Sequence, residues 1–138
     1  MPVIALRMVD SGDYPFLYKM LGERSLIDSI SHRKMPTYEE HVAFCDAGPY
    51  KGWYIIILDE GGNGKHIGNC YISKQNELGI FLKKEYQRKG ISQPALQLLM
   101  SMYPGVEFLA NIAPGNARSI TLFEQRLGFQ HVQNTYRR

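Results

Sequence analysis

Three strand-like segments between residues 53 and 82, separated by short turns, constrain the fold more than any other feature of the sequence. They are WYIIIL (53–58), HIGNCYIS (66–73) and NELGIFL (76–82), and their β-branched and aromatic residues favour strands. The first connection contains Asn63-Gly64, a pair that tolerates positive φ at both positions and so predicts a two-residue hairpin turn. The middle of the chain is therefore predicted to form an antiparallel meander.

Helices and further strands are predicted on both sides of this meander. Before it come a strand over residues 3–9, a broken helix over 10–24, and a short helix that a capping box of Thr37 and Glu40 opens. After it come a helix over 92–103, a strand over 106–112, a helix that Asn116 can cap, and a strand over 129–136. In the helix over 92–103, the predicted buried stripe is Ala95, Leu98, Leu99 and Met102. The order β-α-α-β-β-β-α-β-α-β predicts an α/β fold with a mixed central sheet flanked by helices.

Size and composition set limits on the class of protein. A length of 138 residues predicts a single domain over 1–138. Cys45 and Cys70 have no metal-ligand spacing, so we expect buried reduced thiols and no bound metal. The longest apolar run, residues 53–58, is far short of a membrane span of about 18 residues. Without a basic leader or cleavage site at residues 1–10, the expected location is cytoplasmic, with no membrane partner.

A basic loop followed by an apolar helix is the strongest chemical signal in the sequence. In KKEYQRKGISQPALQLLM (83–100), several cations precede Gly90 and a helix begins at once. A helix start offers unpaired N–H groups and a partial positive charge, and a glycine lets the chain turn with positive φ. The stretch therefore predicts a phosphate or pyrophosphate site. The alternative is a plain tight turn with solvated cations.

Two blocks of sequence resemble a known family. QRKGIS (87–92) resembles the Q/R-x-x-G-x-G/A signature of the GNAT superfamily of acyl-CoA-dependent N-acyltransferases. NARSITLFEQRLGF (116–129) resembles the second conserved block of that superfamily, in which an asparagine opens a helix that ends in an aromatic-x-x-x-Gly-Phe sequence. The resemblance extends over residues 67–136, and the upstream element order agrees with it.

This resemblance implies a fold and a cofactor. The sheet should splay between its fourth and fifth strands, and acetyl-CoA should lie in the opening as a cosubstrate. The pantetheine arm would pair with the backbone of Ile80, Phe81 and Leu82, and one of their N–H groups would polarise the thioester carbonyl. The pyrophosphate would bind the loop of Gln87, Arg88, Lys89, Gly90, Ile91 and Ser92. Asn116, Ser119 and Phe123 would line the pantetheine channel.

Two positions depart from the family pattern. Ser92 replaces the final Gly/Ala of the first signature, and its hydroxyl could cap the helix or bind a phosphate oxygen. Phe123 stands where many relatives carry a tyrosine that is thought to protonate the leaving thiolate. A thiol of pKa about 8.5 is still a tolerable leaving group, so we expect slower turnover rather than none. Water, Tyr136 or Thr121 could take the place of the tyrosine.

The attacking amine must lose a proton, and Glu77 is the predicted base. It lies about 10 Å from Ile80 at 3.3 Å per residue, within reach through ordered water; the alternative is an exposed charge at a turn. His32 and His41 are second-line candidates.

The segment before the second strand carries the signals for the acceptor. Residues 29–41 are loosely similar to GNAT members that acetylate an amino group on a nucleotide-linked deoxysugar. His32 and Tyr54 are the predicted acceptor-binding residues, with Arg24, Arg33 and Lys34 suited to an anionic substrate and Tyr38 and Trp53 to stacking. The predicted function is transfer of an acetyl group to a primary amine of a small molecule.

Other functions remain open on the sequence. They are acetylation of a protein amino terminus or lysine, acetylation of an antibiotic, and a non-catalytic module that binds acetyl-CoA. A nucleic-acid binder is disfavoured because the net charge is only +3 and no nucleic-acid module is recognisable. A homodimer is possible.

Overall fold

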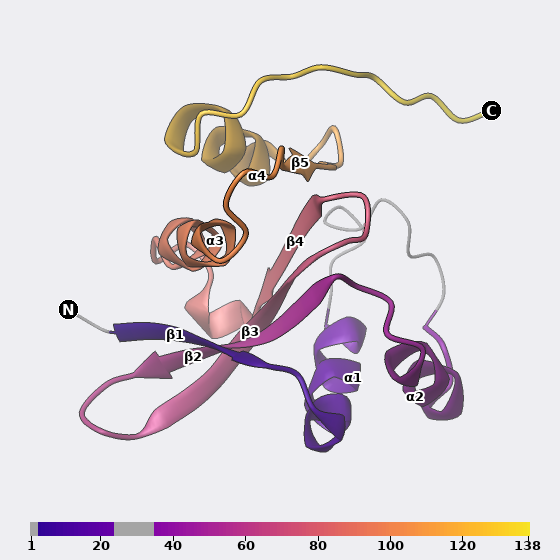
Figure 1. Cartoon of the computed structure of the whole chain (residues 1–138), viewed down its shortest axis with the longest axis vertical. Helices are drawn as coiled ribbons and strands as arrows, with labels where there is room; N and C mark the ends of the chain where they lie inside the picture. Colours follow the sequence, from indigo (N-terminus) through magenta and orange to yellow (C-terminus); the bar gives the residue numbers. More distant parts are fainter. Residues whose placement is uncertain (1–2, 24–34) are drawn as a thin grey trace.

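A five-stranded mixed sheet with the order β1-β2-β3-β4-β5 forms the centre of the molecule (Figure 1). The structure is a computed structural model, and it describes residues 3–23 and 35–138. The strands are β1 (Val3–Met8), β2 (Gly52–Asp59), β3 (Gly64–Ile72), β4 (Glu77–Leu82) and β5 (Leu109–Ala110). The first four pair antiparallel, whereas β4 and β5 pair parallel. The predicted meander and mixed sheet are therefore confirmed.

The β2–β3 turn differs from the predicted two-residue hairpin. Asp59 pairs with Gly64, so four residues, 60–63, connect the strands. The positive φ angles belong to Gly61 (81°) and Gly62 (96°), not to Asn63. The carboxylate of Asp59 accepts a hydrogen bond from the Gly62 N–H at 2.8 Å. The Asn63-Gly64 prediction was wrong because the two preceding glycines, which lack a Cβ, take up the left-handed conformation more readily.

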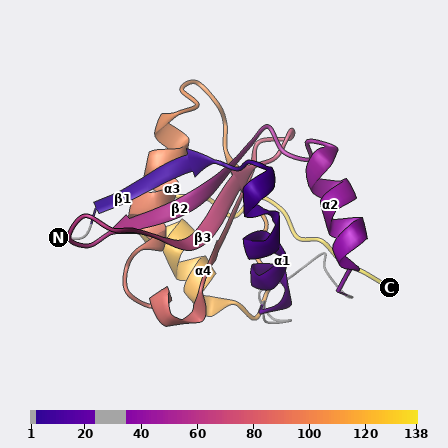
Figure 2. The same cartoon turned by 90° about the horizontal axis from the view of Figure 1, so that it is seen from below.

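Helices cover both faces of the sheet. The helices α1 (Tyr14–Gly22) and α2 (Tyr38–Asp46) lie on one side, and α3 (Ser92–Ser101) and α4 (Ala117–Thr121) on the other (Figures 1 and 2). The capping box at the start of α2 is present, with Thr37 Oγ1 accepting from the Glu40 N–H and Glu40 Oε1 from the Thr37 N–H. A short 3-10 helix (Ser11–Asp13) precedes α1, which accounts for the broken pattern predicted there.

The main core lies between the sheet and α3. Ala95, Leu96 and Leu99 are fully buried, but Leu98 and Met102 are 39% and 41% exposed. The predicted stripe was therefore right for Ala95 and Leu99 and wrong for the other two. The buried face follows Ala95 and Leu99 at i, i+4 with Leu96 beside them, because α3 packs through this side onto β1, β3 and β4.

The carboxyl-terminal region carries less regular structure than the sequence predicts. The strand predicted over 106–112 shortens to β5, and residues 129–136 form no strand. Val132 and Tyr136 are 75% and 88% exposed, and the tail runs away from the sheet (Figure 1). A strand needs a neighbour with which to exchange backbone hydrogen bonds, and the two residues of β5 give the tail no such edge.

Both cysteines are buried and free, as predicted. Burial raises the pKa of the Cys70 thiol to about 12. Within residues 3–23 and 35–138, no helix has the length and apolar character needed to cross a bilayer. In the same ranges, no three side chains of the His, Cys, Asp or Glu types gather as a metal site would require.

Candidate functional site

The sheet opens between β4 and β5. Their parallel ladder consists of Glu77 paired with Leu109 and Leu78 paired with Ala110, whereas β4 continues to Leu82. The splay predicted between the fourth and fifth strands is therefore confirmed. Among the described residues, no strand lies beside this edge of β4 from Gly79 to Leu82.

The alternation of backbone groups decides which residues face this opening. Lys83 N donates to Ile67 O at 2.8 Å, toward β3. Because successive residues of a strand point their N–H and C=O groups to opposite sides, the backbone groups of Phe81, two residues before Lys83, also point toward β3. The backbone groups of Ile80 and Leu82 then face the opening. Of the three residues predicted to pair with an extended ligand, Phe81 is thus placed to contribute its side chain rather than its amide.

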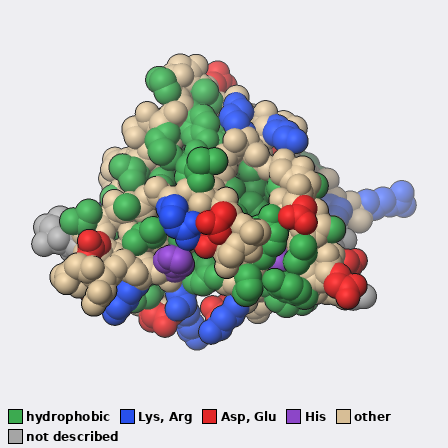
Figure 3. All heavy atoms as spheres, turned by 60° about the horizontal axis from the view of Figure 1, so that its bottom comes forward, with side chains coloured by type: hydrophobic (Ala, Val, Ile, Leu, Met, Phe, Trp, Pro, Cys, Tyr) green, Lys and Arg blue, Asp and Glu red, His purple; other side chains and the backbone are tan. Residues whose placement is uncertain are grey.

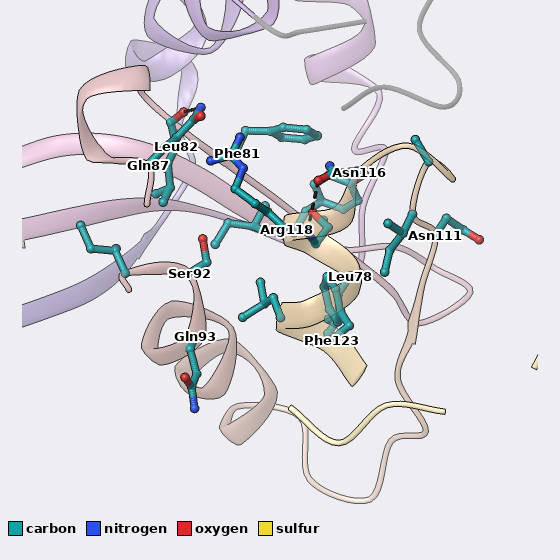
Figure 4. Close-up of a pocket in the computed structure, with 18 of the residues that line it drawn as sticks. Leu78, Phe81, Leu82, Gln87, Ser92, Gln93, Asn111, Asn116, Arg118 and Phe123 are labelled. Atoms are coloured by element: carbon teal, nitrogen blue, oxygen red, sulfur yellow. Dashed lines mark hydrogen bonds between the residues drawn. The ribbon is translucent and has the colours of Figure 1, made fainter. Parts of the chain in front are cut away.

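The loop after β4 has the backbone that the glycine signature predicts. Gly90 has φ of +74°, and Arg88 has φ of +61°. A Cβ built at Gly90 would meet no heavy atom within 4 Å, so the backbone conformation, not crowding, requires glycine there. Gln87 Nε2 donates to Leu82 O at 3.0 Å (Figure 4) and so ties the loop to the end of β4.

The start of α3 is left without a side-chain cap. Ile91 is the N-cap residue, and it makes no side-chain hydrogen bond to the helix. Pro94, at the third helical position, has no N–H group, so Ser92 and Gln93 carry the remaining unpaired donors of the first turn. Both residues line a large cavity. Their N–H groups and the helix dipole make this end of the cavity suited to an anion.

The cavity has a volume of about 1440 Å³ and extends from β4 to α4 (Figure 4). Among the described residues, four cationic side chains and the two carboxylates of Glu23 and Glu77 line it; the cations are Lys84, Arg88, Arg118 and Arg126. The cationic lining matters more than the net charge of the chain, since charge focused in a cleft acts directly on a ligand. On the different face seen in Figure 3, the described basic and acidic side chains are interspersed with apolar ones.

Most of the predicted site residues come together in this cavity. They are Glu77, Ile80, Phe81, Leu82, Gln87, Arg88, Gly90, Ile91, Ser92, Asn116, Ser119 and Phe123. Lys89 does not line it, and His32 lies outside the described residues. Lys84, one of the cations that precede Gly90, also lines the cavity. Arg118, Arg126 and Gln93 line it but were missed, because the first two fall at positions that the second motif leaves open and Gln93 lies just beyond the first motif.

Two side-chain hydrogen bonds hold the Glu77 carboxylate in the cavity. Ser73 Oγ donates to Glu77 Oε1 at 3.3 Å, and Asn111 Nδ2 donates to Glu77 Oε2 at 2.5 Å. All three residues line the cavity. The carboxylate is therefore oriented across the splay, from β4 toward the segment after β5. Ser73 and Asn111 carry no motif, and only the tertiary structure brings them to Glu77.

Residues of the second sequence block have structural partners as well. Asn116 Oδ1 accepts from the Ser119 N–H at 3.1 Å and caps α4, as predicted. Phe123 is 5% exposed and packs edge-to-face on Phe129 at 5.1 Å. It lies in a π-helical turn (Leu122–Arg126) that continues α4.

Tyr54 is not brought to the site. Its hydroxyl lies 2.6 Å from that of Tyr103, and it packs against the core on the α3 side of the sheet. Burial, together with this hydrogen bond, raises the pKa of Tyr103 to about 12. Because side chains alternate along a strand, the side chain of Trp53 points to the opposite face from that of Tyr54, toward α1 and α2.

His41, the second-line candidate, is 5% exposed, and its Nε2 lies 3.1 Å from Tyr14 O. The rings of Tyr14, Tyr18 and Tyr38 surround it. It lines a second, smaller cavity rather than the large one.

Comparisons with known proteins identify related folds. The family model described as an acetyltransferase (GNAT) domain matches residues 4–130. No curated protein sequence matches the chain. A solved domain from Methanocaldococcus jannaschii DSM 2661 superposes with a TM-score of 0.85 at 23% identity, covering 98% of this chain and 93% of that one.

Two other similar structures carry functional names. One is yncA, a putative acetyltransferase from Salmonella typhimurium with its cofactor acetyl-CoA (TM-score 0.69, 18% identity, 92% of this chain and 79% of that one). The other is a ribosomal-protein-alanine N-acetyltransferase from Brucella melitensis (TM-score 0.71, 20% identity, 94% and 86%). At these identities the likeness shows the fold, and the family model shows the family.

Proposed function

Since the chain belongs to the GNAT acetyltransferase family, and is therefore an acetyl-CoA-dependent N-acetyltransferase, we propose that it acetylates a primary amine of a small molecule or peptide by direct attack. One observation carries the proposal. The edge of β4 at Ile80 and Leu82, which has no strand neighbour among the described residues, leads directly to the start of α3 at Ser92, which no side chain caps. An extended arm and a diphosphate, joined as they are in coenzyme A, would match these two features in this order.

The residues present fit such a cosubstrate. The backbone groups of Ile80 and Leu82 can pair with the amides of the pantetheine arm as a neighbouring strand would. The N–H groups of Ser92 and Gln93, with Arg88 beside them, can hold the diphosphate. Arg118 and Arg126 line the opposite wall and add positive charge for the remaining phosphate.

The chain's own residues supply the proton transfers. When bound, acetyl-CoA supplies an acetyl thioester, whose carbon bonds to the amine nitrogen as the C–S bond breaks and the thiolate leaves. We propose that Glu77 accepts, through water, the proton that the acceptor's ammonium group loses before the neutral amine attacks, since Glu77 lies about 10 Å from Ile80 by strand rise. Ser73 and Asn111 hold its carboxylate in place.

The leaving thiolate must gain a proton, which Phe123 cannot donate. Of the two hydroxyls considered from the sequence, Thr121 lines the cavity, whereas Tyr136 lies in the exposed tail. We assign the proton to water or to Thr121. A thiolate with a pKa near 8.5 leaves readily enough for either.

Three classes of acceptor fit the proposal. A nucleotide-linked amino sugar was suggested by residues 29–41, of which 29–34 lie outside the described part. A protein amino terminus gains support from the name of the Brucella melitensis neighbour. A lysine side chain is a third possibility.

The test combines binding and turnover. Acetyl-CoA binding is measured by calorimetry, and thiol release is measured against a panel of amines. Arg88→Gln and Lys89→Gln form a matched pair, because Arg88 lines the cavity and its neighbour does not. We expect Arg88→Gln to weaken binding by about fivefold to tenfold, in the range of a charge-assisted hydrogen bond, and Lys89→Gln to change it by less than twofold. Equal effects of the two changes, or binding without thiol release from any amine, would refute the proposal.

A further inference from the structure

A second cavity of about 300 Å³ lies on the other face of β4, between the sheet and the helices α1 and α2. Five aromatic rings form much of its wall: Phe44, Tyr50, Trp53, Tyr71 and Phe81. Tyr50 stacks on Tyr71 with ring centroids 4.0 Å apart, and Trp53 meets Tyr50 edge-on at 4.9 Å. The rings therefore support one another in a fixed arrangement. The volume is at the low end of about 300–1,000 Å³ for ligand pockets, which suits one apolar group.

The two cavities share a wall. Met20, Phe44, Tyr50, Tyr71 and Phe81 line both of them. A group held in the smaller cavity would thus lie next to the large cavity, where we propose that acetyl-CoA binds.

Strand alternation places the Glu77 side chain on the face of β4 that borders the aromatic cavity. Glu77, Gly79 and Phe81 occupy alternate positions of β4, so their side-chain directions agree. At Gly79 the ring of Tyr71 covers the strand so closely that a Cβ would lie 2.1 Å from Tyr71 Cζ. The predicted base and the aromatic cavity therefore lie on the same face of β4.

One buried polar group in this apolar wall lacks a complete set of partners. Asn69 is 5% exposed and lines the cavity. Trp53 Nε1 donates to its Oδ1 at 3.0 Å. Because indole N–H can only donate, the amide atom facing it must be oxygen, which fixes the position of Nδ2. Among the described residues, no hydrogen bond uses Asn69 Nδ2, and a buried unsatisfied donor is costly.

The N–H donor of Asn69 disfavours an ammonium group at that position in the cavity. Glu40 is its sole carboxylate among the described lining residues, and Glu40 Oε1 already accepts from the Thr37 N–H at 2.8 Å. An ammonium group placed beside Asn69 would face N–H groups that carry partial positive charge. An oxygen of a carbonyl or carboxylate would instead satisfy them.

We propose that this cavity holds the non-reacting part of the acceptor, and that the acceptor is an amine bearing an apolar or aromatic group next to a hydrogen-bond-accepting oxygen. An amino acid amide and the first residue of a peptide share this chemistry. The inference rests on the proposed function and narrows its substrate class. Polyamines and other polycations are disfavoured.

Trp53 provides a direct measurement, because it is the sole tryptophan of the chain and lines the cavity. Phenylalaninamide and phenethylamine are titrated separately while its fluorescence is recorded. The two compounds differ in the carboxamide. At pH 6 both amines are protonated, so the comparison is not disturbed by a difference in charge.

Asn69→Asp is the test variant, since it keeps an oxygen for Trp53 and replaces the N–H donor by an acceptor. In the unchanged protein, we expect phenylalaninamide to bind about tenfold more tightly than phenethylamine. In Asn69→Asp, that ratio should fall to about one. Lys89→Gln, outside both cavities, is the control and should keep the tenfold ratio.

Three results would overturn the inference. They are an equal ratio in the unchanged protein and in Asn69→Asp, tighter binding of spermidine than of either aromatic amine, and thiol release without any response of Trp53. Calorimetry of acetyl-CoA binding distinguishes failure of this inference from failure of the proposed function. If the unchanged protein does not bind acetyl-CoA, the proposed function itself is refuted. If the inference holds, phenylalaninamide and a tripeptide beginning with phenylalanine distinguish a free amino acid derivative from a peptide by their kcat/KM values.

Discussion

Gly90 offers the sharpest test of the anion site, through the paired substitutions Gly90→Gln and Gly90→Glu. The two new side chains have nearly the same shape and differ in charge. At φ of +74°, either one should cost about 1–2 kcal/mol of folding free energy, because a residue with a Cβ is strained in the left-handed region. No steric cost adds to this, since no heavy atom lies within 4 Å of the Cβ position. Equal unfolding midpoints for the two variants in urea would verify this step.

The difference in affinity for coenzyme A then reports charge alone. A carboxylate about 5 Å from a phosphate charge is repelled by roughly 0.8 kcal/mol at a dielectric constant of 80 and roughly 3 kcal/mol at 20. Gly90→Glu should therefore bind coenzyme A about 4-fold to 150-fold more weakly than Gly90→Gln. The ratio should shrink at high salt, because ions screen exposed charges beyond about 3 Å at 1 M ionic strength.

Isothermal titration calorimetry at 20 mM and at 500 mM salt measures both quantities. Desulfo-coenzyme A, which lacks the thiol but keeps the phosphates, is the control ligand and should give the same ratio. If Gly90→Gln and Gly90→Glu bind coenzyme A equally at low salt while both are folded, the phosphates do not lie at this loop. The assignment of the start of α3 as an anion site would then be wrong.

Three further changes test other parts of the molecule. Glu77→Gln should lower kcat/KM at least tenfold at pH 7 and several-fold less at pH 9, where more of an amine of pKa about 10.4 is already free; a pH-rate profile shows whether the two losses are equal, in which case the base lies elsewhere. Tyr54→Phe removes the hydrogen bond to Tyr103 and should cost about 1 kcal/mol in urea unfolding while leaving the acceptor KM unchanged; a changed KM would return Tyr54 to the acceptor site. Burial raises the pKa of the Asp13 carboxyl, but its hydrogen bonds from Arg7 and from the Asp10 N–H outweigh this and lower it overall. The stability that this ionised carboxylate contributes is therefore present above its unfolded pKa of about 3.9 and is lost as pH falls through the lower folded value. Arg7→Ala should cost about 1–2 kcal/mol at pH 7, a value reduced by the 37% exposure of Arg7, and clearly less at pH 2.5; an equal cost at both pH values would contradict the ion-pair account.

Local signals in the sequence were enough to predict most of the fold. The β-branched runs gave β2, β3 and β4, and the Thr37–Glu40 box gave the start of α2. These features act within a few residues, so they can be recognised without knowledge of the tertiary structure. The exposed positions of Leu98 and Met102 could not be predicted, because the angle at which α3 docks on the sheet decides them.

The residues of the candidate site also fall into those that local motifs predict and those that only the tertiary structure reveals. Gly90 and Asn116 belong to short motifs and were found, with positive φ at the first and a helix cap at the second. Asn111 and Asn69 belong to no motif. Their roles depend on Glu77 and Trp53, which lie 34 and 16 residues away along the chain, so they emerge only when the sheet is assembled.

The register of β4 against β3 connects the two parts of the site. Gly79 lies under the ring of Tyr71, and Gly68 lies where a Cβ would be 2.2 Å from Phe81 O. Each glycine therefore allows a close approach that no other residue would permit at that position. A slip of one residue would turn Glu77 and Phe81 toward the α3 core and move Leu78 out of it. The close contacts at Gly68 and Gly79 thus keep the backbone of Ile80 and Leu82 at the opening between β4 and β5, while the Phe81 side chain reaches the aromatic cavity and Glu77 lines the large one.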